Sequence, residues 1–85
     1  MRTIAREMRG IPYALLKEYL QELGGTIVDE HHVQGEGWSI YLERMEPFRL
    51  GSLQVGQTRL TMELEDGVAD DFLLRFAKKT LRAGA

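Results

Sequence analysis

Residues 53–66 read LQVGQTRLTMELED, and the alternation of apolar and polar side chains along them decides the fold. Gly56-Gln57 is a two-residue Gly-X loop of the kind that closes a type II′ β-hairpin. A turn at this position sets Leu60 opposite Leu53. The alternation from residue 58 to residue 65 has no break, so we expect one face of this strand to be buried and the other to face solvent.

The N-terminal segments predict a strand and then a helix. Residues 1–10 alternate in polarity, which fits an edge strand or a frayed arm, and we expect the strand. Pro12 is expected at the first helical position, and Gly24-Gly25 is expected to end the helix. Between them, apolar residues recur at helical spacing at positions 15, 16, 19, 20 and 23.

The middle of the chain predicts further strands. Residues 26–33 form one strand, residues 34–37 its turn, and residues 38–44 the return strand, which starts with a buried Trp38. The third strand covers residues 48–55. Its two halves have opposite parity, and a bulge at Gly51 would reconcile them.

The last helix is expected to start after Asp66-Gly67 and to run to about Arg82. Its apolar residues spread beyond the stripe that one sheet can cover, and Leu74 and Leu81 are the excess. The simpler reading is that both leucines contact the first helix. The functional reading is a subunit contact, because residues seven apart lie on one helix face.

The predicted fold class is α+β, with a possible strand followed by helix, four strands and helix. Short links make the strands an antiparallel meander of four to five strands, and both helices must cover its apolar face. Residues 1–85 are expected to form one domain, since a chain of this length has a single core.

Composition excludes several classes of function. The net charge of −2 argues against general affinity for nucleic acid or for an anionic membrane surface. No apolar run approaches the ~18 residues of a membrane span, and the N-terminus lacks a signal peptide's apolar core, so we expect a cytoplasmic protein. Cysteine is absent, which removes disulfides, thiol catalysis and thiolate metal sites. Asparagine is absent too, which suggests a thermophilic source.

His31 and His32, together with Glu30, form the constellation that could hold a metal ion. Residues two apart on a strand share a face, so the two histidines are expected on opposite faces. A four-residue turn pairs Val33 with Trp38 and places His32 on the open face, whereas one bulged residue would exchange the two histidines. Neither set supplies the three or four ligands of a usual zinc site, so no metal site is expected.

The open sheet face is expected to carry Tyr41 and Arg59 among several glutamates. Glu63 and Glu65 could serve as a general acid and base, but neighbours on a regular strand with no pocket are better read as a solvated face. The same acidity argues against a nucleic-acid platform.

The order strand, helix, four-stranded meander, helix is similar to the fold of TATA-binding-protein repeats. Residues 9–12 (RGIP), Tyr19-Leu20 and the ending Leu23-Gly24-Gly25 also resemble a small family from thermophilic bacteria. The resemblance implies an accessory domain of the kind that follows a ubiquitin-like sulfur-carrier domain related to the small subunit of molybdopterin synthase. Sulfur carriers end in Gly-Gly and this sequence ends Ala83-Gly84-Ala85, so we expect that the chain is not itself a sulfur carrier.

The first functional hypothesis is a non-enzymatic binding or assembly domain that self-associates, as a dimer, through its open sheet face or its last helix. Its interface candidates are Leu74, Leu81, Tyr41 and Arg59. The alternative is a small-ligand or metal-binding accessory protein in sulfur-carrier or molybdopterin cofactor metabolism, and a third reading is a small acid–base enzyme. No cofactor is expected, and the sequence does not identify a protein partner.

Overall fold

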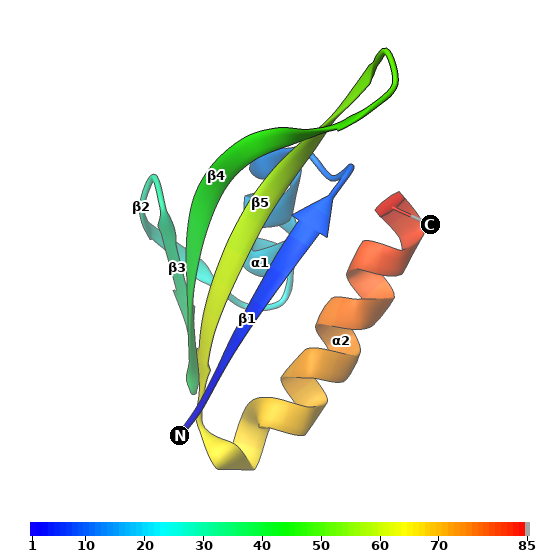
Figure 1. The fold of residues 1–85 in the computed structure, drawn as a ribbon. Coiled ribbons are helices and arrows are strands. Elements are labelled where there is room, and N and C mark those ends of the chain that lie inside the picture. Colours follow the sequence, from blue (N-terminus) through cyan, green and yellow to red (C-terminus); the bar gives the residue numbers. More distant parts are fainter. Residues whose placement is uncertain (85) are drawn as a thin grey trace.

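A five-stranded antiparallel sheet with two helices forms the protein, as the computed structural model shows for residues 1–84 (Figure 1). In chain order the elements are β1 (Arg2–Arg9), α1 (Tyr13–Glu22), β2 (Thr26–Asp29), β3 (His32–Gly35), β4 (Trp38–Leu50), β5 (Leu53–Leu64) and α2 (Asp66–Gly84). The strands lie in the order β1-β5-β4-β3-β2. The predicted α+β class is confirmed, and residues 2–9 form an edge strand, not a frayed arm.

Both helices cover the same face of the sheet. Leu60 on β5, Leu16 on α1 and Phe76 on α2 are fully buried in one core cluster. The other large buried members of this cluster are Ile11, Tyr13, Leu20, Leu23, Val33, Trp38, Ile40, Leu42, Met62, Leu64 and Phe72. The predicted burial of Trp38 is therefore confirmed.

The hairpin predicted at Gly56-Gln57 is wrong. The β4–β5 turn lies at Gly51-Ser52, where Gly51 has φ +63°, and β5 runs straight through residues 56 and 57. This register sets Leu42 opposite Leu60 and continues along both strands to their far ends. The observed register is favoured over the predicted one because it buries the apolar side chains of β4 next to those of β5. Leu53, which the predicted register would bury beside Leu60, is 65% exposed at the turn.

The predicted bulge at Gly51 is also misplaced. Met45 pairs with Gln57 and Phe48 with Val55, so residues 46 and 47 of β4 lie opposite Gly56 alone. Two residues facing one is the definition of a β-bulge. The bulge lies where the sequence predicted a break between a strand over residues 38–44 and a strand over residues 48–55, and β4 continues through it from Trp38 to Leu50.

The segment predicted as one strand over residues 26–33 is a short hairpin. Asp29 accepts a hydrogen bond from the His31 backbone N–H at 2.8 Å, and this side-chain contact reverses the chain at Glu30-His31. The following turn occupies Glu36-Gly37, with Gly35 opposite Trp38, instead of the predicted four-residue turn. The pairing across this turn shifts by two residues from the predicted one, so His32, Ser39 and Tyr41 keep their predicted face.

The ends of α1 follow local chemistry. Pro12 has φ −56° and ψ 143°, which is extended backbone, so it is the N-cap and not the predicted first helical residue. At the other end, Gly25 donates to the Leu20 carbonyl and Gly24 to the Gln21 carbonyl, both at 3.0 Å. This pair of bonds is a Schellman motif, and the predicted helix end is confirmed.

On α2, Leu74 and Leu81 are 57% and 68% exposed. The prediction that they contact the first helix is therefore wrong, because Lys79 reaches α1 instead, through an ion pair with Glu22 at 2.9 Å. The two leucines lie on another flank of the helix. Neither described helix has the length and apolarity needed to span a bilayer.

Candidate functional site

The face of the sheet opposite the helices carries polar side chains drawn from four strands. We call it the open face, and its residues are Glu7, His32, Ser39, Tyr41, Glu43, Arg59, Thr61 and Glu63. They share this face because the strand registers place them in cross-strand rows and because side chains alternate along each strand. The open face contains two of the four predicted interface candidates, Tyr41 and Arg59.

Arg59 lies in the middle of one cross-strand row. Its guanidinium is 3.3 Å from a Glu7 carboxylate oxygen on β1 and 3.8 Å from a Glu43 carboxylate oxygen on β4. The Arg59 side chain is 44% exposed, so each ion pair contributes at most about 1 kcal/mol. The main effect of the two carboxylates is to hold the guanidinium between β1 and β4.

Tyr41 lies in the next row and is held as well. Its ring stacks on the His32 ring, with 4.2 Å between centroids and 14° between planes. The far side of the His32 ring is fixed by a short contact between Nε2 and the Ser39 hydroxyl. Tyr41 is nevertheless 44% exposed, so it presents an oriented aromatic surface to solvent. The sequence predicted Glu30, His32, Ser39 and Tyr41 together on this face; three of them lie there, whereas Glu30 lies in the β2–β3 turn with its carboxylate 4.0 Å from His31.

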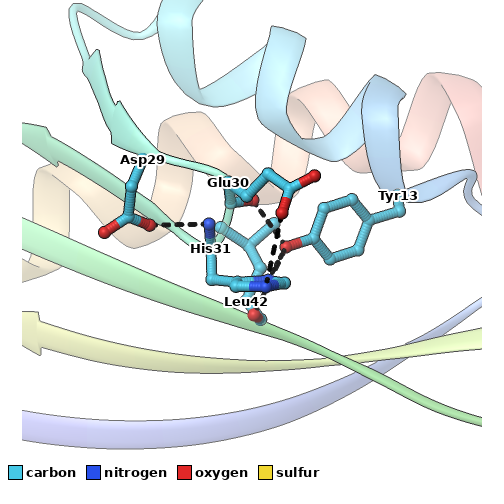
Figure 2. A network of polar contacts seen from close by, with 5 residues as sticks. All are labelled: Tyr13, Asp29, Glu30, His31 and Leu42. Atoms are coloured by element: carbon cyan, nitrogen blue, oxygen red, sulfur yellow. Dashed lines mark hydrogen bonds and ion pairs between the residues drawn. The ribbon is translucent and has the colours of Figure 1, made fainter.

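His31 points the other way and joins a polar cluster around Tyr13 (Figure 2). The Tyr13 hydroxyl lies 2.8 Å from the Glu30 carbonyl oxygen, 2.7 Å from His31 Nδ1 and 3.4 Å from the Leu42 carbonyl oxygen. The Arg44 guanidinium covers the Tyr13 ring at 4.2 Å. Three separate segments of the chain therefore meet at one phenol.

One assignment of hydrogens satisfies both short contacts of the Tyr13 hydroxyl. A phenol has one hydrogen and a carbonyl oxygen can only accept, so the phenol donates to Glu30 and accepts from a protonated His31 Nδ1. Burial raises the pKa of the Tyr13 phenol; the Arg44 charge opposes the rise, and the charges of Glu30 and Asp29 add to it. The phenol thus acts as a neutral clamp between α1 and the β2–β3 turn.

Tyr13 was not among the site residues predicted from the sequence, although a signal for it was present. Tyr13 is three residues before Leu16 and seven before Leu20, on the buried stripe of α1. A tyrosine on a buried stripe needs a hydrogen-bond partner for its hydroxyl. Its partners are backbone carbonyls and a turn histidine, which sequence spacing does not reveal.

The metal candidates do not converge. His31 Nε2 is 4.0 Å from a Glu30 carboxylate oxygen, but His32 extends onto the open face and contacts Ser39. Within residues 1–84 no group of three or more His, Asp or Glu side chains is arranged to hold a metal ion. His31 and Glu30 offer two ligands, fewer than a usual zinc site requires.

A hollow of about 560 Å³ lies where the N-terminal end of α1 meets the β4–β5 hairpin. Tyr13 and Arg44 are the titratable residues in its lining, alongside backbone and apolar groups such as Pro47 and Val55. Tyr13 is clamped and the Arg44 guanidinium covers its ring. The hollow therefore supplies no paired carboxylates or free histidine for acid–base chemistry.

The fold and its surface define a small α+β domain with one sheet face uncovered. The chain belongs to the archaeal MoaD-like protein family, whose model matches residues 4–85. No curated protein matches the chain. The family match runs from β1 into the C-terminal helix, so it covers the open face and both helices.

Proposed function

We propose that this chain is a non-enzymatic binding and assembly domain that serves as an accessory in sulfur-carrier and molybdopterin cofactor metabolism. Its relation to that metabolism rests on membership of the archaeal MoaD-like family, over residues 4–85, and on the resemblance of residues 9–12 and 23–25 to accessory domains of sulfur carriers.

The observation that carries the binding role is the state of Tyr41 and Arg59. Both side chains are 44% exposed, yet each is held in one orientation by its neighbours, Tyr41 by His32 and Arg59 by two carboxylates. Tyrosine and arginine are the residue types that contribute most at protein interfaces. Side chains that are already ordered lose less entropy when a partner binds, which favours a docking surface.

The charge of the open face indicates what kind of partner fits. Around Tyr41, Glu7, Glu43 and Glu63 outnumber Arg59, so this part of the face is acidic; Arg9 lies on the same side of the sheet but further along, over the Phe48 ring. A protein with a basic rim around an apolar patch would complement it. The proposed partner is a component of the sulfur-transfer machinery with such a surface.

The test is a calorimetric titration of the protein with a purified MoaD-type sulfur-carrier protein that ends in Gly-Gly. Tyr41→Ala and Arg59→Ala should each weaken binding about tenfold or more, since each removes an ordered anchor. Glu18→Ala, at an exposed position of α1 away from the open face, is the matched control and should bind like the wild type. Equal loss in all three variants, or no heat with the wild type, would exclude the proposed function.

A further inference from the structure

The outer edge of β1 is open. Among the described residues β1 pairs only with β5. The Gly10 N–H donates to the Gly56 carbonyl at 3.0 Å, and peptide groups alternate in direction along an antiparallel strand. The backbone N–H and C=O groups of the even-numbered residues therefore point towards β5. Those of Thr3, Ala5, Glu7 and Arg9 point away from the sheet. All four are exposed and none is proline.

The other long free edge is blocked. Past Leu42 no residue of β3 lies beside β4. There the strand carries the bulge at Glu46-Pro47, where proline has no N–H to donate and the Glu46 carbonyl already accepts from the Gln57 side chain at 2.9 Å. Bulges and prolines are the usual means of preventing edge pairing. The β1 edge has neither a bulge nor a proline, although it carries the charged side chains of Arg2, Arg6, Glu7 and Arg9.

The exposed leucines of α2 border this same edge. Asp70 pairs with Arg2 of β1 at 3.1 Å, and Leu81 lines a shallow hollow together with Arg6 and Met8. At ~100° per residue, Asp70, Leu74, Ala77 and Leu81 fall within about 60° of the helix circumference. Leu74 therefore lies on the β1 side of α2. Figure 1 shows α2 running alongside β1, with no strand beyond it.

We infer that a second copy of this chain occupies this surface, with β1 pairing antiparallel to its twin and the two α2 helices packing side by side. One twofold axis perpendicular to the sheet produces both contacts, because it extends the sheet and keeps all helices on one face. The inference deepens the assembly part of the proposed function by naming the partner and the edge that it uses.

The two contacts share a midpoint, as a single axis requires. Antiparallel α2 helices that place Leu74 against Leu81 of the other copy are centred between residues 77 and 78. That point is about 11 Å along the helix from Asp70. Ala5 is about 10 Å along β1 from Arg2, and the Arg2–Asp70 ion pair joins the two starting points. Ala5 and the centre of the leucine pair are therefore at the same level.

Charge selects the register centred on Ala5. In that register Ala5 faces Ala5 of the other copy, Thr3 faces Glu7, and Arg6 faces Ile4. Moving the centre to Arg6 sets two arginines directly opposite each other, and moving it to Ile4 sets Arg6 opposite Arg2. Like charges directly opposite destabilise a strand pair. The small side chains of Ala5 and Ala77 lie at the centres of the strand pair and of the helix pair. They allow the two copies to approach closely.

Sedimentation equilibrium on the full chain tests the leucine contact. The wild type should be a dimer, and Leu74→Glu/Leu81→Glu should raise the dissociation constant about 100-fold or more, because the change replaces buried apolar area with charge. The matched control is Leu50→Glu/Leu53→Glu at the β4–β5 turn, where the leucines are 64% and 65% exposed. It should remain dimeric. A monomeric wild type, or dissociation only in the control, overturns the inference.

A proline tests the strand contact. Ala5→Pro removes an N–H that faces outward and so costs no bond within the monomer, whereas Ala5→Val keeps it. Ala5→Pro should be monomeric and Ala5→Val dimeric. If Ala5→Pro fails to fold, amide exchange in the wild type decides: Ala5 and Glu7 should exchange more slowly at high protein concentration. Amide exchange that does not depend on protein concentration overturns the inference. Neither result bears on binding by the open face, which the calorimetric titration tests separately.

Discussion

The Tyr13 clamp makes a prediction at the scale of one residue. Tyr13→Phe should lower the free energy of unfolding by about 0.5–1.5 kcal/mol at pH 7, because it removes the bond to the Glu30 carbonyl and leaves His31 Nδ1 without its partner. Urea unfolding followed by circular dichroism measures the difference.

The same clamp predicts a pH dependence of stability. The pKa of the phenol is raised in the folded state, so the folded protein holds this proton more tightly than the unfolded chain does. The contribution of Tyr13 is complete below pH ~10 and is lost as pH rises through the raised value. The stability difference between wild type and Tyr13→Phe should therefore shrink above pH ~10. Tyr41→Phe is the control, and an identical trend in that variant would contradict the clamp.

Trp38 depends on a glycine that faces it. A Cβ built at Gly35 would come within 2.1 Å of the Trp38 ring, which is 7% exposed and packs on Phe72 with 4.7 Å between ring centroids. Gly35→Ala should cost more than about 2 kcal/mol and shift the tryptophan fluorescence to longer wavelength, because the ring must leave the core.

Gly67 provides the comparison for that substitution. It lies in the first turn of α2, and a Cβ there meets no atom within 4 Å. Gly67→Ala should therefore stabilise the protein by about 0.5–1 kcal/mol. Equal and small effects of the two substitutions would show that Trp38 does not pack against Gly35.

Among the elements, β5 gives the main prediction, which concerns the burial of its Leu60 side chain. Leu60 is fully buried on a strand that pairs on both sides, so Leu60→Ala should cost about 2–5 kcal/mol in denaturant unfolding. Leu53→Ala, at the exposed turn, should change stability by less than about 0.5 kcal/mol. A large effect at Leu53 together with a small one at Leu60 would restore the hairpin at Gly56-Gln57.

The misplaced hairpin shows which part of the fold the sequence determines. The alternation of residues 58–65 fixed which side of β5 is buried, because alternation depends only on the strand's own pleat. The partner residues depend on which of two Gly-X pairs turns the chain. Local turn chemistry did not distinguish Gly51-Ser52 from Gly56-Gln57, and the choice came from pairing Trp38, Ile40 and Leu42 with β5.

At the scale of the whole molecule, the candidate site was partly predictable. Tyr41 and Arg59 could be assigned to the open face from parity alone, and both lie there. Their ordering by His32 and by two carboxylates required the sheet order, because Glu7 reaches Arg59 from a strand 52 residues away in the chain. The Tyr13–His31 contact likewise depends on how the β2–β3 turn folds over α1.

The sequence left two readings of Leu74 and Leu81 open, contact with the first helix or exposure for a subunit contact. The apolar arc of α2 indicated an excess of leucines, but helical spacing cannot tell whether α1 or solvent lies beside them. The structure places α1 beside Lys79 and leaves the leucines next to the edge of β1. A subunit contact there remains a proposal that sedimentation can test.

The central claim is that the protein acts by binding through its open sheet face. The most direct test is a titration of the isotope-labelled protein with unlabelled MoaD-type sulfur-carrier protein, followed by backbone amide shifts. Binding by the open face should concentrate the shifts at Tyr41, Arg59 and Thr61, with little change at Tyr13 and along α1. Shifts centred on Tyr13 and the hollow beside it, or no shifts at all, would contradict the claim.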